Sequence, residues 1–171
     1  MQELRGSFNV LLAAFAVLLV QSAFATLLAP YPFTPYLALP FVFALATAPG
    51  VRVLRGAVTA FALGYLYDLF TGNPLGMHTF VFVLGYLVAW LTGYLLSFRG
   101  VPFEMVLTFV LTLAVGTVVE GIRSFTPGGV SWSTGALLLA LFGSATATSL
   151  VAPLLFAVAR RLDPAAERAQ A

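Results

Sequence analysis

Residues 78–98, HTFVFVLGYLVAWLTGYLLSF, form a run of 21 residues without a single Asp, Glu, Lys or Arg. An α-helix rises about 1.5 Å per residue, and a helix of roughly 20 residues crosses the hydrocarbon core of a bilayer. This stretch therefore predicts a membrane-spanning helix.

The rest of the chain has the same character. Of its 171 residues 61% are hydrophobic and only 8% are charged, and the mean hydropathy is +1.02, far above the range of soluble globular proteins. We therefore expect one integral membrane domain over residues 1–171, built from α-helices. The sequence has no cysteine, which excludes disulfides, thiolate metal sites and cysteine nucleophiles. Its arginines are scattered between apolar runs, which disfavours nucleic-acid binding.

Five other apolar runs flank this stretch, and short turns rich in proline and glycine separate them. Short turns predict a compact bundle of antiparallel helices with six membrane spans. The spans are expected over residues 7–28, 36–48, 55–70, 78–98, 102–123 and 133–158, followed by a short cytoplasmic tail over residues 159–171. The second run has about 13 residues, fewer than the roughly 20 that a crossing needs, and it contains Pro40. A short kinked span and a re-entrant hairpin are both compatible with it.

The arginines predict the orientation, because cytoplasmic loops retain positive charge. With the N-terminus inside, only Arg123 falls on the outer side. The other seven fall in cytoplasmic segments: Arg5, Arg52, Arg55, Arg99, Arg160, Arg161 and Arg168. If residues 36–48 did not cross, the later arginine clusters would move outside, so the charges favour a crossing and two cytoplasmic termini. Ala23 and Ala25 resemble a signal-peptide cleavage site, but the first run is longer than a signal core, which favours an uncleaved helix.

Four ionisable side chains are expected at one depth in the outer half of the membrane. Asp68 lies 13 residues after Arg55, which corresponds to a rise of about 20 Å along the third span. Glu120 and Arg123 lie near the end of the fifth span, and His78 opens the fourth. The sequence therefore predicts a polar cluster with a structural or partner-contact role.

Each member of this cluster has an alternative role. An acid within a membrane span is a functional candidate by default, so Asp68 is either a structural carboxylate or a proton or substrate site; its shallow depth favours the structural role. Arg123 is expected to pair with Glu120 and is also placed to reach Asp68. For His78, a polar tip at the headgroup level is favoured over a metal ligand, because a lone histidine makes a poor metal site. Glu104, in the first turn of the fifth span, is interpreted as a helix cap.

Enzymatic chemistry is disfavoured. The sequence contains no P-loop, no HExxH and no GxGxxG motif, so no nucleotide, zinc or other cofactor site is expected. The pair Tyr67–Asp68 resembles the motif of intramembrane aspartyl proteases, but that chemistry needs two carboxylates, and the other aspartate, Asp163, lies in the predicted tail. We therefore expect no catalytic residues.

Small residues mark positions where helices can approach closely. Gly85 and Gly93 lie on the fourth span, and Gly143 and Ala147 form a small-xxx-small step on the sixth. They are candidate notches for docking a partner helix. Packing within the bundle is the favoured alternative.

The segment from Asp68 to Gly76, DLFTGNPLG, carries a family resemblance. An aspartate that ends the third span, followed by Gly72, Pro74, Leu75 and Gly76 before the fourth, resembles the rod shape-determining protein MreD family. The resemblance implies a non-enzymatic scaffold in the bacterial inner membrane that belongs to the cell-elongation machinery for peptidoglycan synthesis. It implies an MreC-like bitopic partner and, through it, a RodA-type glycosyltransferase, a penicillin-binding transpeptidase and an MreB-like actin, and it is compatible with a homo-oligomer.

Two other functions remain open. Six spans with short loops also resemble the substrate-binding subunits of energy-coupling-factor vitamin transporters, and a small proton-coupled carrier is the third hypothesis. Under the scaffold hypothesis, Asp68 is expected to fix the turn over residues 71–76 against the fifth helix. This turn is also expected to need Gly72 or Gly76 for a backbone conformation that other residues disfavour, with Pro74 stiffening it.

Overall fold

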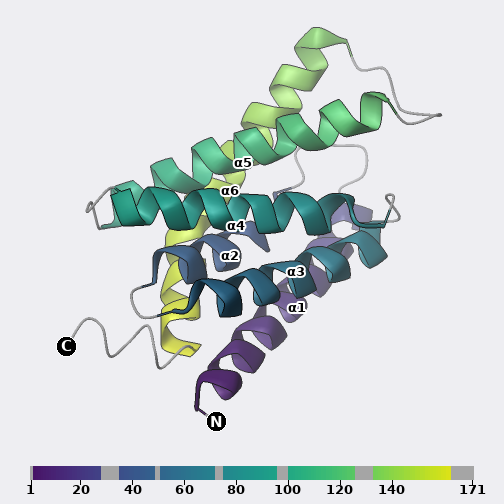
Figure 1. Ribbon diagram of the computed structural model, residues 1–171. Coiled ribbons are helices and arrows are strands. Elements are labelled where there is room, and N and C mark those ends of the chain that lie inside the picture. Colours follow the sequence, from purple (N-terminus) through teal and green to yellow (C-terminus); the bar gives the residue numbers. More distant parts are fainter. Residues whose placement is uncertain are drawn as a thin grey trace.

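A computed structural model describes residues 2–27, 35–48, 51–71, 75–95, 100–125 and 133–162, with the side chains of the first helix described from residue 8 to residue 23. The described residues form six α-helices joined by short connections, which confirms the predicted all-α fold (Figure 1). The helices are α1 (Gln2–Leu27), α2 (Leu39–Thr47), α3 (Val53–Thr71), α4 (Met77–Leu95), α5 (Val101–Ser124) and α6 (Thr134–Leu162).

Four helices, α3 to α6, are long and apolar enough to cross a membrane. In α1 the described apolar part, Phe8–Ala23, is shorter than a full crossing. Helix α2 has nine residues and a length of about 14 Å, roughly half of a hydrocarbon core. The crossing predicted for residues 36–48 therefore contains only a short helix. The expected total of six spans stays a prediction.

Two antiparallel hairpins organise the bundle, one made by α3 and α4 and the other by α5 and α6. Helix α4 lies between α3 and α5, and α1 packs against α3 (Figure 1). At the end that we call the Asp68 end, α3 and α5 finish and α4 begins, so it contains Asp68, His78, Glu120 and Arg123. At the opposite end, called the Glu104 end, α4 finishes and α5 begins.

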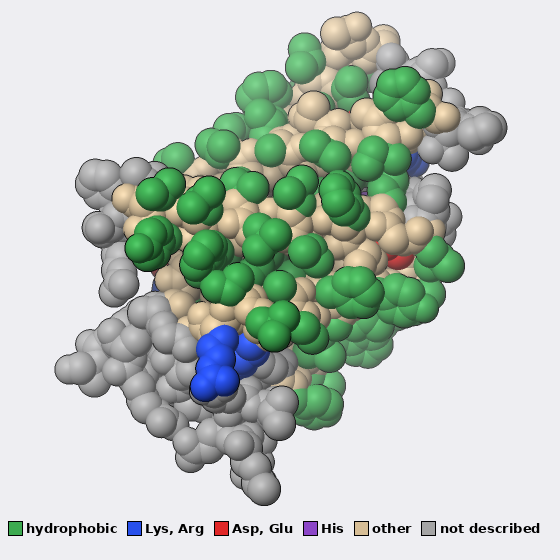
Figure 2. Space-filling view, in the orientation of Figure 1, with side chains coloured by type: hydrophobic (Ala, Val, Ile, Leu, Met, Phe, Trp, Pro, Cys, Tyr) green, Lys and Arg blue, Asp and Glu red, His purple; other side chains and the backbone are tan. Residues whose placement is uncertain are grey.

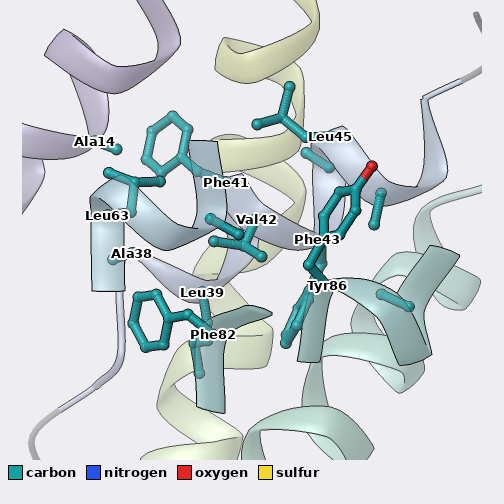
Figure 3. Packing of buried hydrophobic residues seen from close by; sticks show 14 of the residues in the cluster. Ala14, Ala38, Leu39, Phe41, Val42, Phe43, Leu45, Leu63, Phe82 and Tyr86 are labelled. Atoms are coloured by element: carbon teal, nitrogen blue, oxygen red, sulfur yellow. The ribbon is translucent and has the colours of Figure 1, made fainter. Parts of the chain in front are cut away.

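The short helix α2 forms the centre of the core. All its residues from Leu39 to Ala46 are buried, and Phe41, Val42 and Phe43 are fully enclosed in the core, where α2 packs mainly against α4, α6 and α3 (Figure 3). Two backbone amides that precede α2 donate to side chains of other helices: Tyr36 N to the Thr148 hydroxyl and Leu37 N to Gln21 Oε1, each at 3.0 Å. At membrane depth, backbone outside a helix must be buried in protein, where other groups can bond to its amides and carbonyls. The two bonds to Thr148 and Gln21 supply such partners for Tyr36 N and Leu37 N.

Glycines bring the helices together around this core. Gly85 and Gly93 of α4 face Phe43 and Thr47 of α2, so a helix does fill these two predicted notches, and it is α2 of the same chain. Gly85 is buried, and Gly93 is half-buried. On α6, Gly143 and Ala147 are half-buried.

The outer surface of the bundle suits lipid. Figure 2 shows hydrophobic side chains covering the face formed by α3, α4 and α5, with basic side chains gathered at its lower edge. Exposed apolar residues recur along these helices, including Phe61, Leu84, Leu91, Val106 and Val110. Because lipid tails are as apolar as these side chains, this exposure needs no further partner to explain it.

Candidate functional site

The candidate site is centred on Asp68, in the last turn of α3. Its side chain is buried, and the residue is 1% exposed. It faces the first turn of α4, where Gly76 precedes the helix and its carbonyl accepts the first helical hydrogen bond, from Phe80 N at 2.9 Å. Gly76 therefore occupies the N-cap position, and it has no side chain with which to cap the helix.

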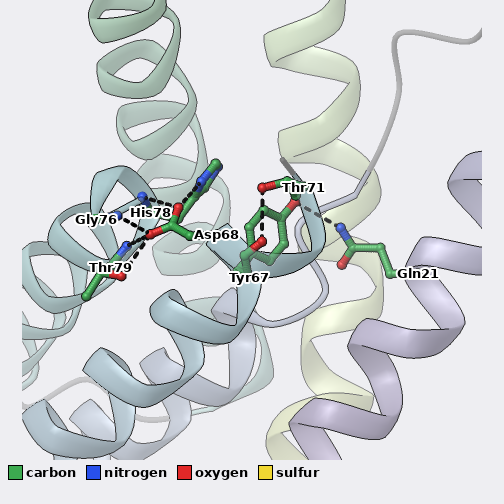
Figure 4. Close-up of polar contacts among 7 residues, drawn as sticks. All are labelled: Gln21, Tyr67, Asp68, Thr71, Gly76, His78 and Thr79. Carbon is green, nitrogen blue, oxygen red and sulfur yellow. Dashed lines mark hydrogen bonds and ion pairs between the residues drawn. The ribbon is translucent and has the colours of Figure 1, made fainter. Parts of the chain in front are cut away.

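Asp68 provides this cap from another helix (Figure 4). Its Oδ2 accepts from the backbone amides of Gly76 at 2.9 Å and Thr79 at 3.1 Å, and from the Thr79 hydroxyl at 2.8 Å. Its Oδ1 accepts from the backbone amide of His78 at 2.9 Å. These amides are donors that a helix N-terminus leaves without an intrahelical partner, and the positive end of the helix dipole favours the carboxylate there.

His78 completes the ring of donors. Its Nδ1 lies 2.9 Å from Asp68 Oδ1, and the tautomer with a proton on Nδ1 donates to the carboxylate. The imidazole ring packs on Tyr67, with centroids 4.6 Å apart, and meets the edge of Phe82. We expected a polar tip at the headgroup level, but His78 is only 2% exposed, because the carboxylate and two aromatic rings hold it inside the bundle.

A close approach of two backbones makes this geometry possible. Gly64 lies four residues before Asp68 and therefore on the same face of α3. A Cβ atom at Gly64 would lie 2.6 Å from the Thr79 Cα and 2.9 Å from the His78 carbonyl oxygen. The missing side chain at Gly64 thus lets α3 reach the backbone of α4, which brings the short Asp68 side chain within range of the amides.

The predicted turn is described only in part. Gly76 has φ +98°, which confirms that a glycine here adopts a conformation that other residues disfavour. Leu75 is 68% exposed. Gly72 and Pro74 lie outside the described residues.

The polar network continues to α1 and α2 through two residues that we did not single out from the sequence, Gln21 and Thr148. Gln21 Nε2 donates to the Tyr67 hydroxyl at 3.1 Å (Figure 4). Its Oε1 accepts from Leu37 N. Thr148 of α6 accepts from Tyr36 N. An amide side chain well inside the apolar run of the first span is a signal that points to Gln21, since the other amide of that run, Asn9, lies near its start. Thr148 has no comparable signal, because α6 carries several hydroxyl side chains.

Glu120 and Arg123 form a separate pair. Arg123 Nη1 donates to Glu120 Oε1 at 3.0 Å, as predicted, and the two side chains are 40% and 22% exposed for Arg123 and Glu120 respectively. Within the described residues, the partners of the Asp68 carboxylate belong to the start of α4, and the guanidinium of Arg123 bonds to Glu120. Asp68 does hold the predicted turn, because the Gly76 amide donates to its Oδ2. Its other donors among the described residues belong to α4, so the turn is fixed to the start of α4 and not, as expected, to the fifth helix.

At the other end of the bundle, Glu104 also differs from its predicted role. Helix α5 has no side-chain hydrogen bond at its N-cap, and Glu104 instead pairs with Arg160 near the end of α6. The pair joins the two helices of the second hairpin. Glu104 is 8% exposed.

This arrangement determines what the Asp68 site can do. A carboxylate offers about four lone-pair positions, and five donors surround that of Asp68. A carboxylate saturated in this way serves as a structural latch between α3 and α4. The described residues contain no group of three His, Asp or Glu side chains that could hold a metal ion.

Comparison with known proteins gives one match. A family model described as rod shape-determining protein MreD matches residues 4–127 of the chain, a region that includes α1 from residue 4 onward, α2 to α5 and the Asp68 site. No curated protein and no solved structure matches.

Proposed function

The chain belongs to the rod shape-determining protein MreD family, and from this premise we propose that it is a non-enzymatic scaffold that binds and positions an MreC-like partner with a single membrane span. The family is one of membrane proteins with a role in rod shape determination, and it is part of the MreBCD shape complex. It is not a known enzyme family.

The observation that carries this proposal is the saturation of the Asp68 carboxylate. A proton carrier or a substrate site needs a carboxylate that exchanges its partners. Asp68 is buried and accepts bonds from three backbone amides, one hydroxyl and one imidazole. Such a carboxylate fixes the geometry of the α3–α4 hairpin, as a scaffold requires.

We propose that the fixed turn presents the contact surface for the partner. Leu75 in the turn is 68% exposed, and Phe80 in the first turn of α4 is 62% exposed. Gly143 and Ala147 remain a second proposed contact, because both are partly exposed on α6. Gly85 is buried, and Gly93 is half-buried but already faces Thr47 of α2.

Through this partner the protein acts in the bacterial inner membrane as part of the cell-elongation machinery for peptidoglycan synthesis. In this proposal its contacts with a RodA-type glycosyltransferase, a penicillin-binding transpeptidase and an MreB-like actin are indirect. All six predicted spans, with both termini in the cytoplasm, would form the scaffold.

The experiment is co-purification of the MreC-like partner with the tagged protein from membranes, using wild type and Asp68→Ala. We expect Asp68→Ala to insert at close to the wild-type level and to recover about tenfold less partner, which corresponds to roughly 1.4 kcal/mol of binding free energy. Glu120→Gln is the matched control, because it removes a carboxylate at the same end that pairs with Arg123 outside the latch, and it should recover the partner at the wild-type level.

Recovery of the partner at the wild-type level with Asp68→Ala would contradict the proposed role of the latch. The same purification distinguishes the other functions. A vitamin-sized ligand that co-purifies with wild type in place of a partner would favour a substrate-binding subunit of a vitamin transporter.

A further inference from the structure

A second polar feature lies on α5 and takes no part in the Asp68 site. Glu104, Thr108 and Thr112 are spaced four residues apart, so they form one stripe along the helix. The three residues are 8%, 0% and 2% exposed. This stripe, which we call the α5 stripe, therefore lies inside the bundle, between α5 and the helices packed on it.

Each residue of the α5 stripe has a buried oxygen without a hydrogen-bond partner among the described residues: Glu104 Oε2, Thr108 Oγ1 and Thr112 Oγ1. Other helical hydroxyls in this chain donate to the carbonyl oxygen four residues earlier, as Thr59, Thr92, Thr117, Ser144 and Thr146 do. Thr117 does so on the same helix, on its exposed side. The hydroxyls of the two threonines of the stripe make no such bond.

The spacing of these residues along the helix suits a bridging water molecule. Residues four apart on a helix are separated by one turn, a rise of about 5.4 to 6 Å. Two O–H···O hydrogen bonds of about 2.7 to 2.8 Å in sequence span nearly the same distance. One water molecule between successive side chains thus reaches both, and a buried water needs two to four polar partners of this kind.

The Glu104 end of the stripe connects to solvent. Glu104 Oε1 pairs with Arg160 of α6, whose side chain is 34% exposed. Glu104 Oε2 is left to face the interior. The carboxylate therefore lies between the partly exposed Arg160 side chain and the next position of the stripe, one helical turn further along α5.

We propose that the α5 stripe binds a file of water molecules that starts at the Glu104–Arg160 pair and ends at Thr112. The file enters the bundle over eight residues of α5, a distance of about 12 Å. The ligand is water because the groups that bind it are hydroxyls and a carboxylate whose charge Arg160 already compensates. This polar path lies at the end of the bundle that the arginine distribution predicts to be cytoplasmic.

The absence of cysteine from the chain gives a direct test. Thr108→Cys and Thr112→Cys place a thiol of similar size in the stripe, and Leu107→Cys and Leu111→Cys place one at neighbouring positions of the same helix that are 6% and 7% exposed. Each variant is reconstituted in nanodiscs and exposed to Ag⁺, which is small enough to follow a file of water. The thiols that remain are counted with a fluorescent maleimide after denaturation.

We expect the thiols of Thr108→Cys and Thr112→Cys to react with Ag⁺ several times faster than those of Leu107→Cys and Leu111→Cys. Each variant is first checked for the elution volume of wild type, and either threonine variant alone suffices if the other does not fold. Slow reaction in all four variants would overturn the proposal, because it would mean that the hydroxyls rotate onto their own backbone carbonyls in a dry interface. Equally rapid reaction in all four would overturn it as well, because it would mean that the whole of α5 opens.

Discussion

Each end of the bundle contains a buried carboxylate, and the two carboxylates differ in how many hydrogen-bond donors surround them. Asp68 is 1% exposed and accepts from five donors, four of which come from residues 78 and 79. Glu104 is 8% exposed, pairs with Arg160 through one oxygen and leaves the other without a partner among the described residues. Burial alone therefore does not define the role of a membrane carboxylate. The number of donors around it does.

The difference comes from the backbone that each carboxylate meets. Asp68 faces the free amides of a helix N-terminus, which Gly64 brings close to α3. Glu104 lies within its own helix, where the amide of Glu104 already donates to the Gly100 carbonyl, so its side chain extends toward α6. The first geometry gives a fixed latch, and the second gives a partly open polar path.

The largest expected effect comes from Asp68→Ala. This change leaves buried amides and the imidazole without an acceptor, and we expect a loss of about 3 to 5 kcal/mol in the free energy of unfolding. Denaturation of the purified protein in mixed micelles measures it. Asp68→Asn keeps one acceptor oxygen and should lose less, while a loss below about 1 kcal/mol for Asp68→Ala would show that the latch is not structural.

A smaller effect is expected from Gly64→Ala. The added Cβ would lie 2.6 Å from the Thr79 Cα, so α3 and α4 must separate, at a cost of about 1 to 3 kcal/mol. The matched control is Gly121→Ala, because a Cβ at Gly121 meets no atom within 4 Å, and it should be neutral or stabilising by up to about 1 kcal/mol. The same unfolding assay compares the two variants, and equal stabilities would contradict the close approach.

The smallest effect is expected at the Glu104 end. A double-mutant cycle with Glu104→Gln and Arg160→Gln should give a coupling energy of about 1 kcal/mol or less, because the Arg160 side chain is 34% exposed and solvent screens the pair. The coupling should fall as salt is added. A coupling that matched the loss from Asp68→Ala would remove the contrast between the two ends.

Much of the fold and part of the site can be predicted from the sequence. Long apolar runs and short turns predicted the helices α3 to α6, and the Asp68–Gly76 segment indicated the family that the match over residues 4–127 shows. The positive φ of Gly76 and the Glu120–Arg123 pair were also predictable, because both depend on residues close together in the chain. Local spacing determines such features.

The sequence by itself determined that the protein is a helical membrane protein with an acid beside a glycine turn, since transfer free energies and turn preferences are properties of individual residues and short segments. Only the tertiary structure decided that α2 fills the core, that Gln21 and Thr148 bind the amides before it, and that Asp68 caps α4 and does not reach Arg123. These contacts depend on how each helix is rotated about its axis and how closely it packs. Hydropathy along the chain does not predict the rotation of a helix or its distance from its neighbours, because both depend on the shapes of the helix surfaces in contact.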